Sequence, residues 1–450
     1  MLVAVGIILV LMLCYCIYRQ DLSVSLYCLC ITSTLLVPSS VKYLSLSPST
    51  IFSYLLFLVS FVYLYKHLYK YEKDTISLLR IIIYYFIIYL CLLPLARTMT
   101  ILLQINDLKI TLLECQLPFS IALILNSRKK VIYIYDWILF ITYIVCIYDL
   151  ICIILQLNPY YIMVGGTNAM ETAVASLSDA RGGLEGRYGS TVGNALYYSV
   201  CVLILLYSNA YGFLVSHHRR IKKMLYYVAF LLLLLNLFFT GSRSTMIAVC
   251  IGGFYYMYKR ISIIKCAFYS FCLYILFCFL LTLNVFGKYQ PLIESTIYFW
   301  NDEISSDSGI KGSSLSMRLI QLVAAFSEID GSAFFFGNGA GWPWWYTETK
   351  GVHPYLLGFE SVLFSGLTEF GVLGFILIYI IFYMLLYHYV KKRRKIYKCS
   401  LEKIEIINSY LLSYAVVAFM TSPYYFTLFL GTLFLMLKSL AILNLSSSEK

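Results

Sequence analysis

The stretch "MLYYVAFLLLLLNLFF", residues 224–239, is apolar around the whole circumference of a helix. A second stretch of the same kind, "FILIYIIFYMLLYHYV", covers residues 375–390. With its flanking residues, each stretch reaches the ~20 residues that a helix needs to cross about 30 Å of hydrocarbon. Both runs are continuous and lack the alternation of polar and apolar residues that a membrane β-barrel requires. They predict transmembrane helices.

The composition of the whole chain agrees with this prediction. Of its 450 residues 61% are hydrophobic and 12% charged, whereas soluble domains have roughly 25% charged residues. We therefore predict an all-α fold, a polytopic transmembrane helical bundle. Thirteen spans are expected, or twelve because the first two are short; they lie near residues 1–18, 22–38, 51–65, 75–95, 105–126, 131–156, 189–214, 224–240, 243–257, 262–285, 359–389, 404–420 and 424–440.

Basic residues gather in short loops between the predicted spans, although the formal net charge of +12 could also suggest nucleic-acid binding. The loops are 66–73, 128–130, 217–223, 259–260 and 391–398. Such loops face the cytoplasm under the positive-inside rule, which places the N-terminus outside and the C-terminus inside. The longest predicted external loop is mildly acidic, so the excess positive charge serves orientation in the bilayer and nucleic-acid binding is excluded.

The spans divide the chain into five parts. Residues 1–156 are N-terminal transmembrane helices, 157–188 an external loop, 189–285 central transmembrane helices, 286–358 a large external (periplasmic) loop and 359–450 C-terminal transmembrane helices.

Within the large loop, the segment 313–335 predicts an amphipathic helix with Ser314 as N-cap and Gly331 as C-terminal stop. Its predicted apolar face consists of Leu315, Leu319, Leu322, Val323 and Phe326. We expect the segment 313–331 to lie at the membrane interface and to roof a cavity in the outer half of the bundle.

His353 is the single histidine predicted on the external side, since His67, His217, His218 and His388 lie in or beside the basic cytoplasmic loops. Two interpretations are open. The imidazole can be a half-exposed interfacial ring, or it can accept a proton near neutral pH as a general base. In the second case Glu360, about two turns further on, could orient the ring.

Arg187, Arg243 and Arg318 are predicted on or near the external face. A guanidinium binds phosphate oxygens through two parallel hydrogen bonds, so these arginines suggest an anionic, lipid-linked ligand. A solvated or snorkelling role is the alternative for each. Asn194 stands in the first turns of the helix that follows Arg187 and could support such a site. Three tryptophans could contact headgroups or stack on sugar rings: Trp342, Trp344 and Trp345.

Several motifs that would indicate other chemistry are missing from the sequence. There is no GxxxxGK[ST] phosphate loop, no HExxH, no pair of CxxC motifs with zinc spacing and no external DxD that would hold Mg²⁺ on a nucleotide sugar. We therefore expect neither a metal nor a cofactor.

The order of motifs between residues 180 and 385 resembles the O-antigen polymerase and O-antigen ligase family of integral membrane glycosyltransferases. An arginine precedes "GSTVGN" (189–194), "TGSRS" (240–244) follows, and the loop helix carries Arg318. A turn "FFFGNGAG" (334–341), a histidine and "LTEFGVLGF" (367–375) complete the set. The chain departs from the family where Val192 and Gly193 precede Asn194, and where a proline follows His353.

The resemblance implies glycosyl transfer from an undecaprenyl-diphosphate-linked oligosaccharide to an acceptor hydroxyl at the periplasmic face of the bacterial inner membrane. His353 would take the acceptor proton, and Arg187, Arg243 and Arg318 would meet the diphosphate charge in place of a metal. The implied partners are the lipid-linked oligosaccharide, the lipid bilayer and a chain-length regulator protein.

Three functions stay open, of which we favour a polysaccharide polymerase that elongates lipid-linked repeat units. An O-antigen ligase would use the lipid A core as acceptor instead. A lipid-oligosaccharide flippase or other transporter would have a similar number of spans, but charged or broken helices would be expected within its membrane region, where Glu114 is one candidate.

Overall fold

The computed structural model describes residues 2–38, 41–43, 46–67, 73–160, 162–164, 189–216, 220–283, 287–297, 315–356, 359, 361–396 and 401–448. These residues form helices joined by turns and one isolated bridge between Tyr43 and Leu46. The helical elements are α1 (Leu2–Arg19), α2 (Leu22–Leu36), α3 (Pro48–His67), α4 (Lys73–Leu92), η1 (Leu93–Leu95), α5 (Ile101–Ile124), α6 (Arg128–Leu155), η2 (Ser190–Val192), α8 (Ala195–Val215), α9 (Arg220–Phe239), α10 (Arg243–Arg260), α11 (Ile263–Thr282), η3 (Gly287–Tyr289), α12 (Gln290–Ile297), α14 (Leu315–Ser327), α15 (Ala333–Phe336), α16 (Trp342–Lys350), α17 (Val362–Phe375), the π-helix η4 (Ile376–Ile381), α18 (Phe382–Ile396), α19 (Leu401–Met420) and α20 (Phe426–Ser448).

Every predicted span coincides with a helix, and the predicted all-α membrane bundle is confirmed. Among the described residues, eight helices are long and apolar enough to cross a membrane: 48–65, 75–95, 128–155, 195–215, 221–239, 362–394, 401–420 and 426–443. The chain is therefore a multi-pass membrane protein. The predicted spans that coincide with α1, α2, α5, α10 and α11 are not among these eight helices, and the total of twelve or thirteen spans stays a prediction.

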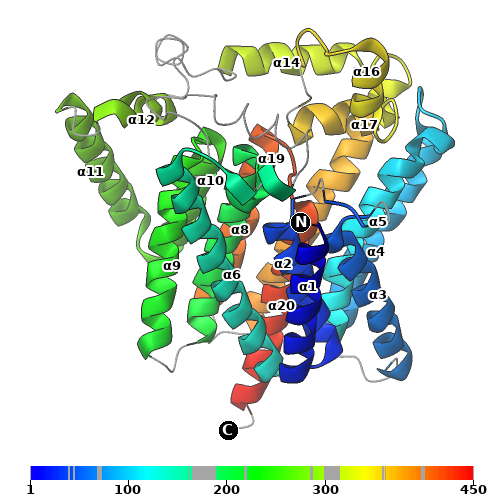
Figure 1. Ribbon diagram of the computed structural model, residues 1–450. Coiled ribbons are helices and arrows are strands. Elements are labelled where there is room, and N and C mark those ends of the chain that lie inside the picture. The colour runs from blue at the N-terminus through cyan, green and yellow to red at the C-terminus, as the bar shows by residue number, and fades with distance from the viewer. Residues whose placement is uncertain are drawn as a thin grey trace.

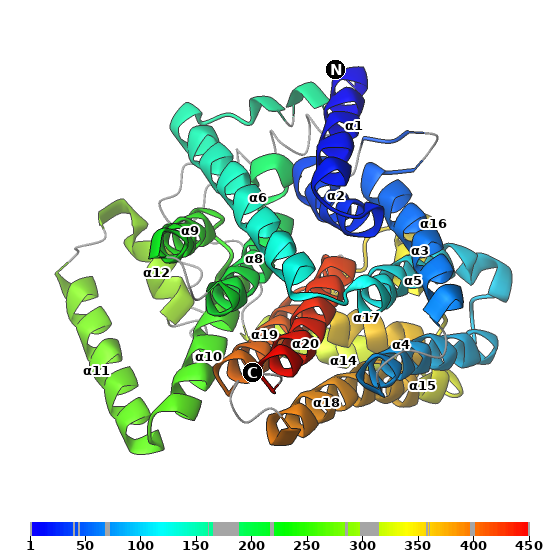
Figure 2. The same ribbon diagram turned by 90° about the horizontal axis from the view of Figure 1, so that it is seen from below.

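Helix α20 occupies the centre of the bundle, where α4, α5, α6, α8 and α19 pack around it (Figure 2). In the same view α11 stands at the edge of the molecule and packs chiefly against α10. The centre of the molecule is thus built by the last helix of the chain together with helices from its first half. The helices pair across long sequence separations, as a polytopic bundle requires.

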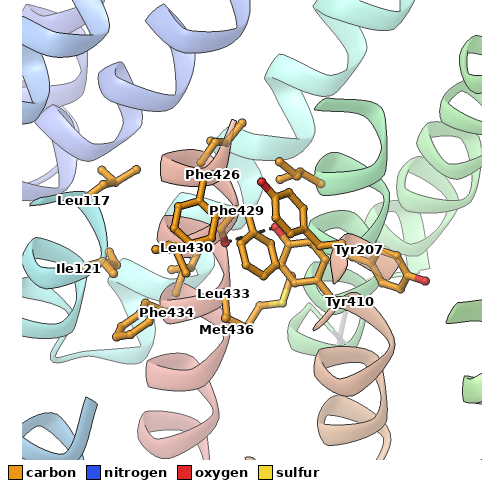
Figure 3. Close-up of a cluster of buried hydrophobic side chains, with 14 of the residues drawn as sticks. Leu117, Ile121, Tyr207, Tyr410, Phe426, Phe429, Leu430, Leu433, Phe434 and Met436 are labelled. Carbon is orange, nitrogen blue, oxygen red and sulfur yellow. Dashed lines mark hydrogen bonds between the residues drawn. The ribbon is translucent and has the colours of Figure 1, made fainter. Parts of the chain in front are cut away.

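The core around α20 is rich in aromatic rings (Figure 3). The rings of Tyr414 and Phe429 stack in parallel with centroids 3.7 Å apart. Two of the buried tyrosine hydroxyls join neighbouring elements: Tyr410 Oη lies 2.6 Å from Thr432 Oγ1, and Tyr414 Oη donates to the Tyr424 carbonyl at 2.9 Å. A buried polar atom without such a bond would be costly in a membrane interior. Tyrosine in this core therefore joins helices through its ring and its hydroxyl together.

The two ends of the bundle differ in composition (Figure 1). Helices α12, α14, α15 and α16 lie at one end, which we call the loop end. The C-terminus and the short basic connections, including the starts of α6 and α9, lie at the opposite end, which we call the basic end. The long loop and the basic loops are therefore on opposite sides of the bundle, as predicted. The assignment of the loop end to the outer membrane face remains a prediction from the positive-inside rule.

Helix α14 crosses the loop end and packs on α17, but it buries a different face from the one predicted. Gln321 and Ala325 are buried, whereas Leu319 and Val323 are 59% and 70% exposed. The alanine side chains are small enough for α14 to approach α17 closely. Of the predicted apolar face Leu322 packs against the core, whereas Leu319, Val323 and Phe326 are exposed. The helix thus covers the end of the bundle and does not project freely, and its exposed apolar side faces the surroundings. Ser314 lies outside the described residues.

Candidate active site at the loop end

The turn 337–341, "GNGAG", docks onto a break in helix α17. Gly371 lies inside that helix with φ 66° and ψ −174°, a conformation that glycine adopts readily and other residues rarely do. Near the break, the Asn338 N–H donates to the Thr368 carbonyl and the Gly339 N–H to the Glu369 carbonyl, each at 2.9 Å. The interrupted helix thus satisfies its carbonyl groups through the glycine-rich turn instead of through its own backbone.

Two glycines are required for this docking because no side chain would fit. A Cβ added at Gly337 would lie 2.1 Å from the Glu369 carbonyl oxygen. A Cβ added at Gly371 would lie 2.5 Å from the carbonyl carbon of Phe335. Both neighbours are backbone atoms that cannot move aside without disrupting the turn. The two motifs "FFFGNGAG" and "LTEFGVLGF" are therefore two halves of one contact.

The same turn is clamped by the connection between α4 and α5. The Met99 N–H donates to the Asn338 carbonyl at 2.8 Å, and Thr98 Oγ1 donates to Asn338 Oδ1 at 2.7 Å. Gln104 Oε1 accepts from the Ala340 N–H at 3.0 Å. Residues 98–104 were not among the predicted site residues, since no motif marks them. They hold the turn in place from the opposite side to α17.

Three carboxylates and two tyrosines lie beneath the turn, and we call them the acid–tyrosine cluster: Asp107, Glu114, Glu369, Tyr85 and Tyr89. Tyr89 Oη donates to Asp107 Oδ2 at 2.6 Å, and Tyr85 Oη lies 3.5 Å from Glu114 Oε2. The Glu369 carboxylate accepts a hydrogen bond from the Gly341 backbone. All three acids are half-buried.

The acid–tyrosine cluster was missed by the sequence analysis apart from Glu114. A signal for it does exist. Asp107 and Glu114 are seven residues apart, which places both on one face of α5 in a helix otherwise rich in apolar residues. The participation of Glu369 could not be read from this spacing, because it depends on how α17 packs against α5.

The length of α17–α18 indicates the level of this cluster in the membrane. The apolar helical segment Val362–Arg394 has 33 residues, or about 50 Å at 1.5 Å per residue, against about 30 Å of hydrocarbon. If the hydrocarbon begins near Arg394, a helix that runs from there towards the loop end leaves the hydrocarbon near the break at Gly371. Glu369 then lies close to the level of the lipid headgroups, where a lipid-linked diphosphate would also lie.

His353 is buried, with its side chain 5% exposed, and both ring nitrogens are engaged. Nδ1 accepts from the Tyr355 N–H at 3.1 Å and from the Leu356 N–H at 2.9 Å. In the neutral ring these two bonds place the proton on Nε2, which lies 3.2 Å from Glu328 Oε1. The ring thus caps the turn 353–356 and pairs with a carboxylate. To accept a proton from a substrate directly, it would have to release one of these partners.

Glu328 is the more accessible member of the pair, with a side chain 28% exposed. A carboxylate that faces a histidine N–H can hold a proton passed from an acceptor hydroxyl. The sequence analysis did not select Glu328, and Glu360, which it did select, lies outside the described residues. The geometry therefore adds Glu328 to the candidates for proton transfer beside His353.

The predicted arginines have different surroundings. Arg318, in the first turns of α14, donates from Nη1 to Gln321 Oε1 at 3.1 Å, and its guanidinium carbon lies 5.7 Å from the Phe364 ring centre on α17. Arg243 is the first residue of α10, half-buried and engaged by neighbours. Arg187 lies outside the described residues. Convergence of the three on one diphosphate stays a prediction.

Asn194 has a structural function as N-cap of α8. Its Oδ1 accepts from the N–H groups of Leu196 at 2.9 Å and Tyr197 at 3.2 Å. The preceding "GST" turn is held by α6, where Asp149 Oδ1 accepts from the Ser190 N–H at 2.9 Å. Asn194 Oδ1 therefore caps the helix, and a ligand at this position would contact the amide nitrogen of Asn194 instead.

Of the three tryptophans, Trp344 alone presents most of its surface, 62% exposed. Trp342 is buried against Tyr346 and Phe359, with ring centroids 5.1 and 5.7 Å away. Trp345 is half-buried. Trp344 is therefore the one suited to stack on a sugar, while Trp342 belongs to the small core that holds α16 and the turn around His353 together.

An apolar cavity of about 290 Å³ lies between η4–α18 and α19–α20. Met384 and Phe419 line it and are 63% and 42% exposed, so the cavity reaches the lipid-facing surface. Its lining extends to Val362, the first residue of α17. An apolar chain in this cavity would therefore reach the start of the helix on which the Phe364 ring faces Arg318.

No protein-family model and no curated protein matches this chain.

Proposed function

We propose that this protein is a polysaccharide polymerase. It would transfer an undecaprenyl-diphosphate-linked glycan onto a hydroxyl of another lipid-linked repeat unit at the loop end. The observation that carries the proposal is the apolar cavity that extends from the lipid-facing surface to Val362, the first residue of α17, the helix on which Arg318 covers the Phe364 ring. This arrangement suits a substrate that combines a long apolar tail with an anionic head.

The proposed reaction has a simple balance of bonds. The acceptor oxygen forms a bond to the anomeric carbon of the donor glycan, and the bond between that carbon and the diphosphate oxygen breaks. The lipid diphosphate leaves with the electron pair, and Arg318 and Arg243 would offset its charge. The acceptor proton passes to the His353–Glu328 pair, whose atoms Nε2 and Oε1 are 3.2 Å apart.

The level of the glycine-rich turn supports this assignment. The turn lies near the headgroup level, so a diphosphate could reach the loop end while its prenyl tail stayed in the bilayer. Trp344 could contact a sugar of the donor or acceptor. A ligase would use the same donor site with the lipid A core as acceptor, and the described residues do not favour one acceptor over the other.

A second candidate function is supported by a specific observation. A lipid-oligosaccharide transporter is expected to have broken helices and ionisable residues among its membrane helices. α17 is broken at Gly371, and Asp107, Glu114 and Glu369 lie beside it. The estimated level of the break, near the headgroups and away from the bilayer midplane, favours the polymerase.

Elongation in detergent separates these functions. The purified protein would be given an undecaprenyl-diphosphate-linked repeat unit, and the product would be resolved as a ladder on a gel. A polymerase makes longer glycans without any membrane compartments, whereas a transporter makes none. In a strain that lacks the gene, a core bearing one repeat unit supports the polymerase and a bare core supports the ligase. Unchanged surface polysaccharide in that strain contradicts all three.

A further inference from the structure

A recess of about 610 Å³ at the basic end carries an unusual concentration of positive charge. Helices α1, α6, α8 and α9 surround it. Its charged lining consists of Arg19, Arg128, Lys129, Lys222 and Asp136. Asp136 is paired with Lys222 through Oδ2 at 2.5 Å, so the lining retains an excess of three positive charges. This recess is at the opposite end of the bundle from the candidate active site and has no part in the proposed reaction.

The remaining three cations have no acidic partner within the part of the chain that the structure describes. Arg19, Arg128 and Lys129 have no ion pair among the described residues, whereas the adjacent Lys130 is paired with Asp21 at 2.7 Å. Lys403 also lies near enough to Arg128 for like-charge repulsion. The recess therefore holds cations that repel one another and that no described acidic residue pairs with.

Helix polarity makes this arrangement more costly still. Arg128 and Lys129 are the first two residues of α6, and Lys222 is the third residue of α9. The N-terminus of a helix carries partial positive charge, which disfavours cations and favours anions. The positive-inside rule accounts for cations on this side of the membrane, but it does not require them to gather around a recess at two helix N-termini.

We infer that the recess binds the phosphate headgroup of an anionic phospholipid from the leaflet at the basic end. A phosphate there would be met by unpaired guanidinium and ammonium groups and by two helix N-termini. Ile132 and Val215 supply apolar surface in the same recess, which suits the glycerol and upper acyl region of a lipid. Basic pockets between membrane helices on the cytoplasmic side bind such headgroups in other proteins.

The test compares two variants of the full chain in detergent, with bound phosphatidylglycerol counted by native mass spectrometry during a titration. Arg128→Gln with Lys129→Gln should weaken retention of this lipid by roughly tenfold or more. The matched control is Lys391→Gln with Lys392→Gln, which removes two exposed cations near the basic end, outside the recess. It should leave retention unchanged. Equal effects of the two pairs would overturn the inference.

Two further measurements keep the result interpretable. Removal of cations from a helix N-terminus should not destabilise α6, and an unchanged melting temperature would verify this. If that variant does not fold, Arg19→Gln at the C-terminus of α1 is the substitute. It should weaken retention of phosphatidylglycerol by a smaller factor, and full retention would contradict the inference. Inorganic phosphate and phosphatidylcholine should each fail to compete with phosphatidylglycerol. Competition by free phosphate as strong as by the lipid would show a soluble-anion site and overturn the lipid assignment.

Discussion

The loop end and the basic end of this bundle use their polar groups in opposite ways. At the loop end the N–H groups of the glycine-rich turn donate to the carbonyls of Thr368 and Glu369 and to Gln104 Oε1. The acid–tyrosine cluster lies beneath this turn. At the basic end the polar groups are long cationic side chains around a recess, three of them without an acidic partner among the described residues.

This difference shows that residue types alone predict the chemistry of the basic end but not that of the loop end. Charge at the basic end follows from the counts of lysine and arginine in short loops, because the bilayer itself selects it. At the loop end the decisive contacts involve carbonyl and N–H groups, which every residue carries. Residue identity matters there mainly where a side chain would collide, as at Gly337 and Gly371.

The largest expected effect concerns His353, at the loop end. If it transfers the acceptor proton, both His353→Ala and His353→Asn should lower the elongation rate by ~10² to 10⁴. Asparagine keeps an acceptor that can cap the turn 353–356, so its variant should melt at a higher temperature than His353→Ala. Rates and melting curves of the two purified variants provide the measurement. Full activity of His353→Asn would show that the ring only caps the turn.

Gly371→Ala should destabilise the protein by about 3 kcal/mol, because the new Cβ meets the backbone of Phe335 and the residue has a positive φ. The control is Gly253→Ala in α10, where the new Cβ has nothing within 4 Å. That substitution should be neutral or slightly stabilising, since alanine favours a helix. Thermal unfolding in detergent measures both. Equal melting temperatures would mean that the contact between the turn and α17 contributes nothing to stability.

Arg318→Lys and Arg243→Lys should each reduce elongation by roughly tenfold to a hundredfold while protein abundance stays near normal, because charge is kept and the bidentate fork is lost. Arg260→Lys is the counterpart at the basic end, where the guanidinium pairs with Glu402. It should leave elongation unchanged. Wild-type elongation by both loop-end variants would separate these arginines from the diphosphate.

Trp344→Ala should weaken the apparent affinity for the lipid-linked substrate by about 1 kcal/mol without a change in melting temperature, because its ring is 62% exposed and contributes little to the core. Trp342→Ala should do the reverse, lowering the melting temperature by the loss of a buried ring. Substrate titrations of the elongation rate distinguish the two. An unaltered affinity for Trp344→Ala would remove this residue from the sugar site.

Much of the fold could be predicted, and less of the candidate site. Each predicted span is a helix because a long apolar run has few alternatives in a bilayer. Helix α14 was expected, but its buried side was not, because the choice between Ala325 and Leu319 depends on the space left by α17. His353 was predicted at the mouth of the bundle, while its bonds to two backbone N–H groups depend on the shape of the following turn.

By itself the sequence determined that this chain is a helical membrane bundle and which of its loops share a side, since hydrophobic length and charge act locally and need no partner. The tertiary structure alone decided what surrounds each polar group. It places Glu369 beside Asp107 and Glu328 within hydrogen-bond distance of His353. It also places Arg19 and Arg128 in the lining of one recess. These pairs are distant along the chain, and they meet where α14 packs on α17 at one end and where α1 and α6 line one recess at the other.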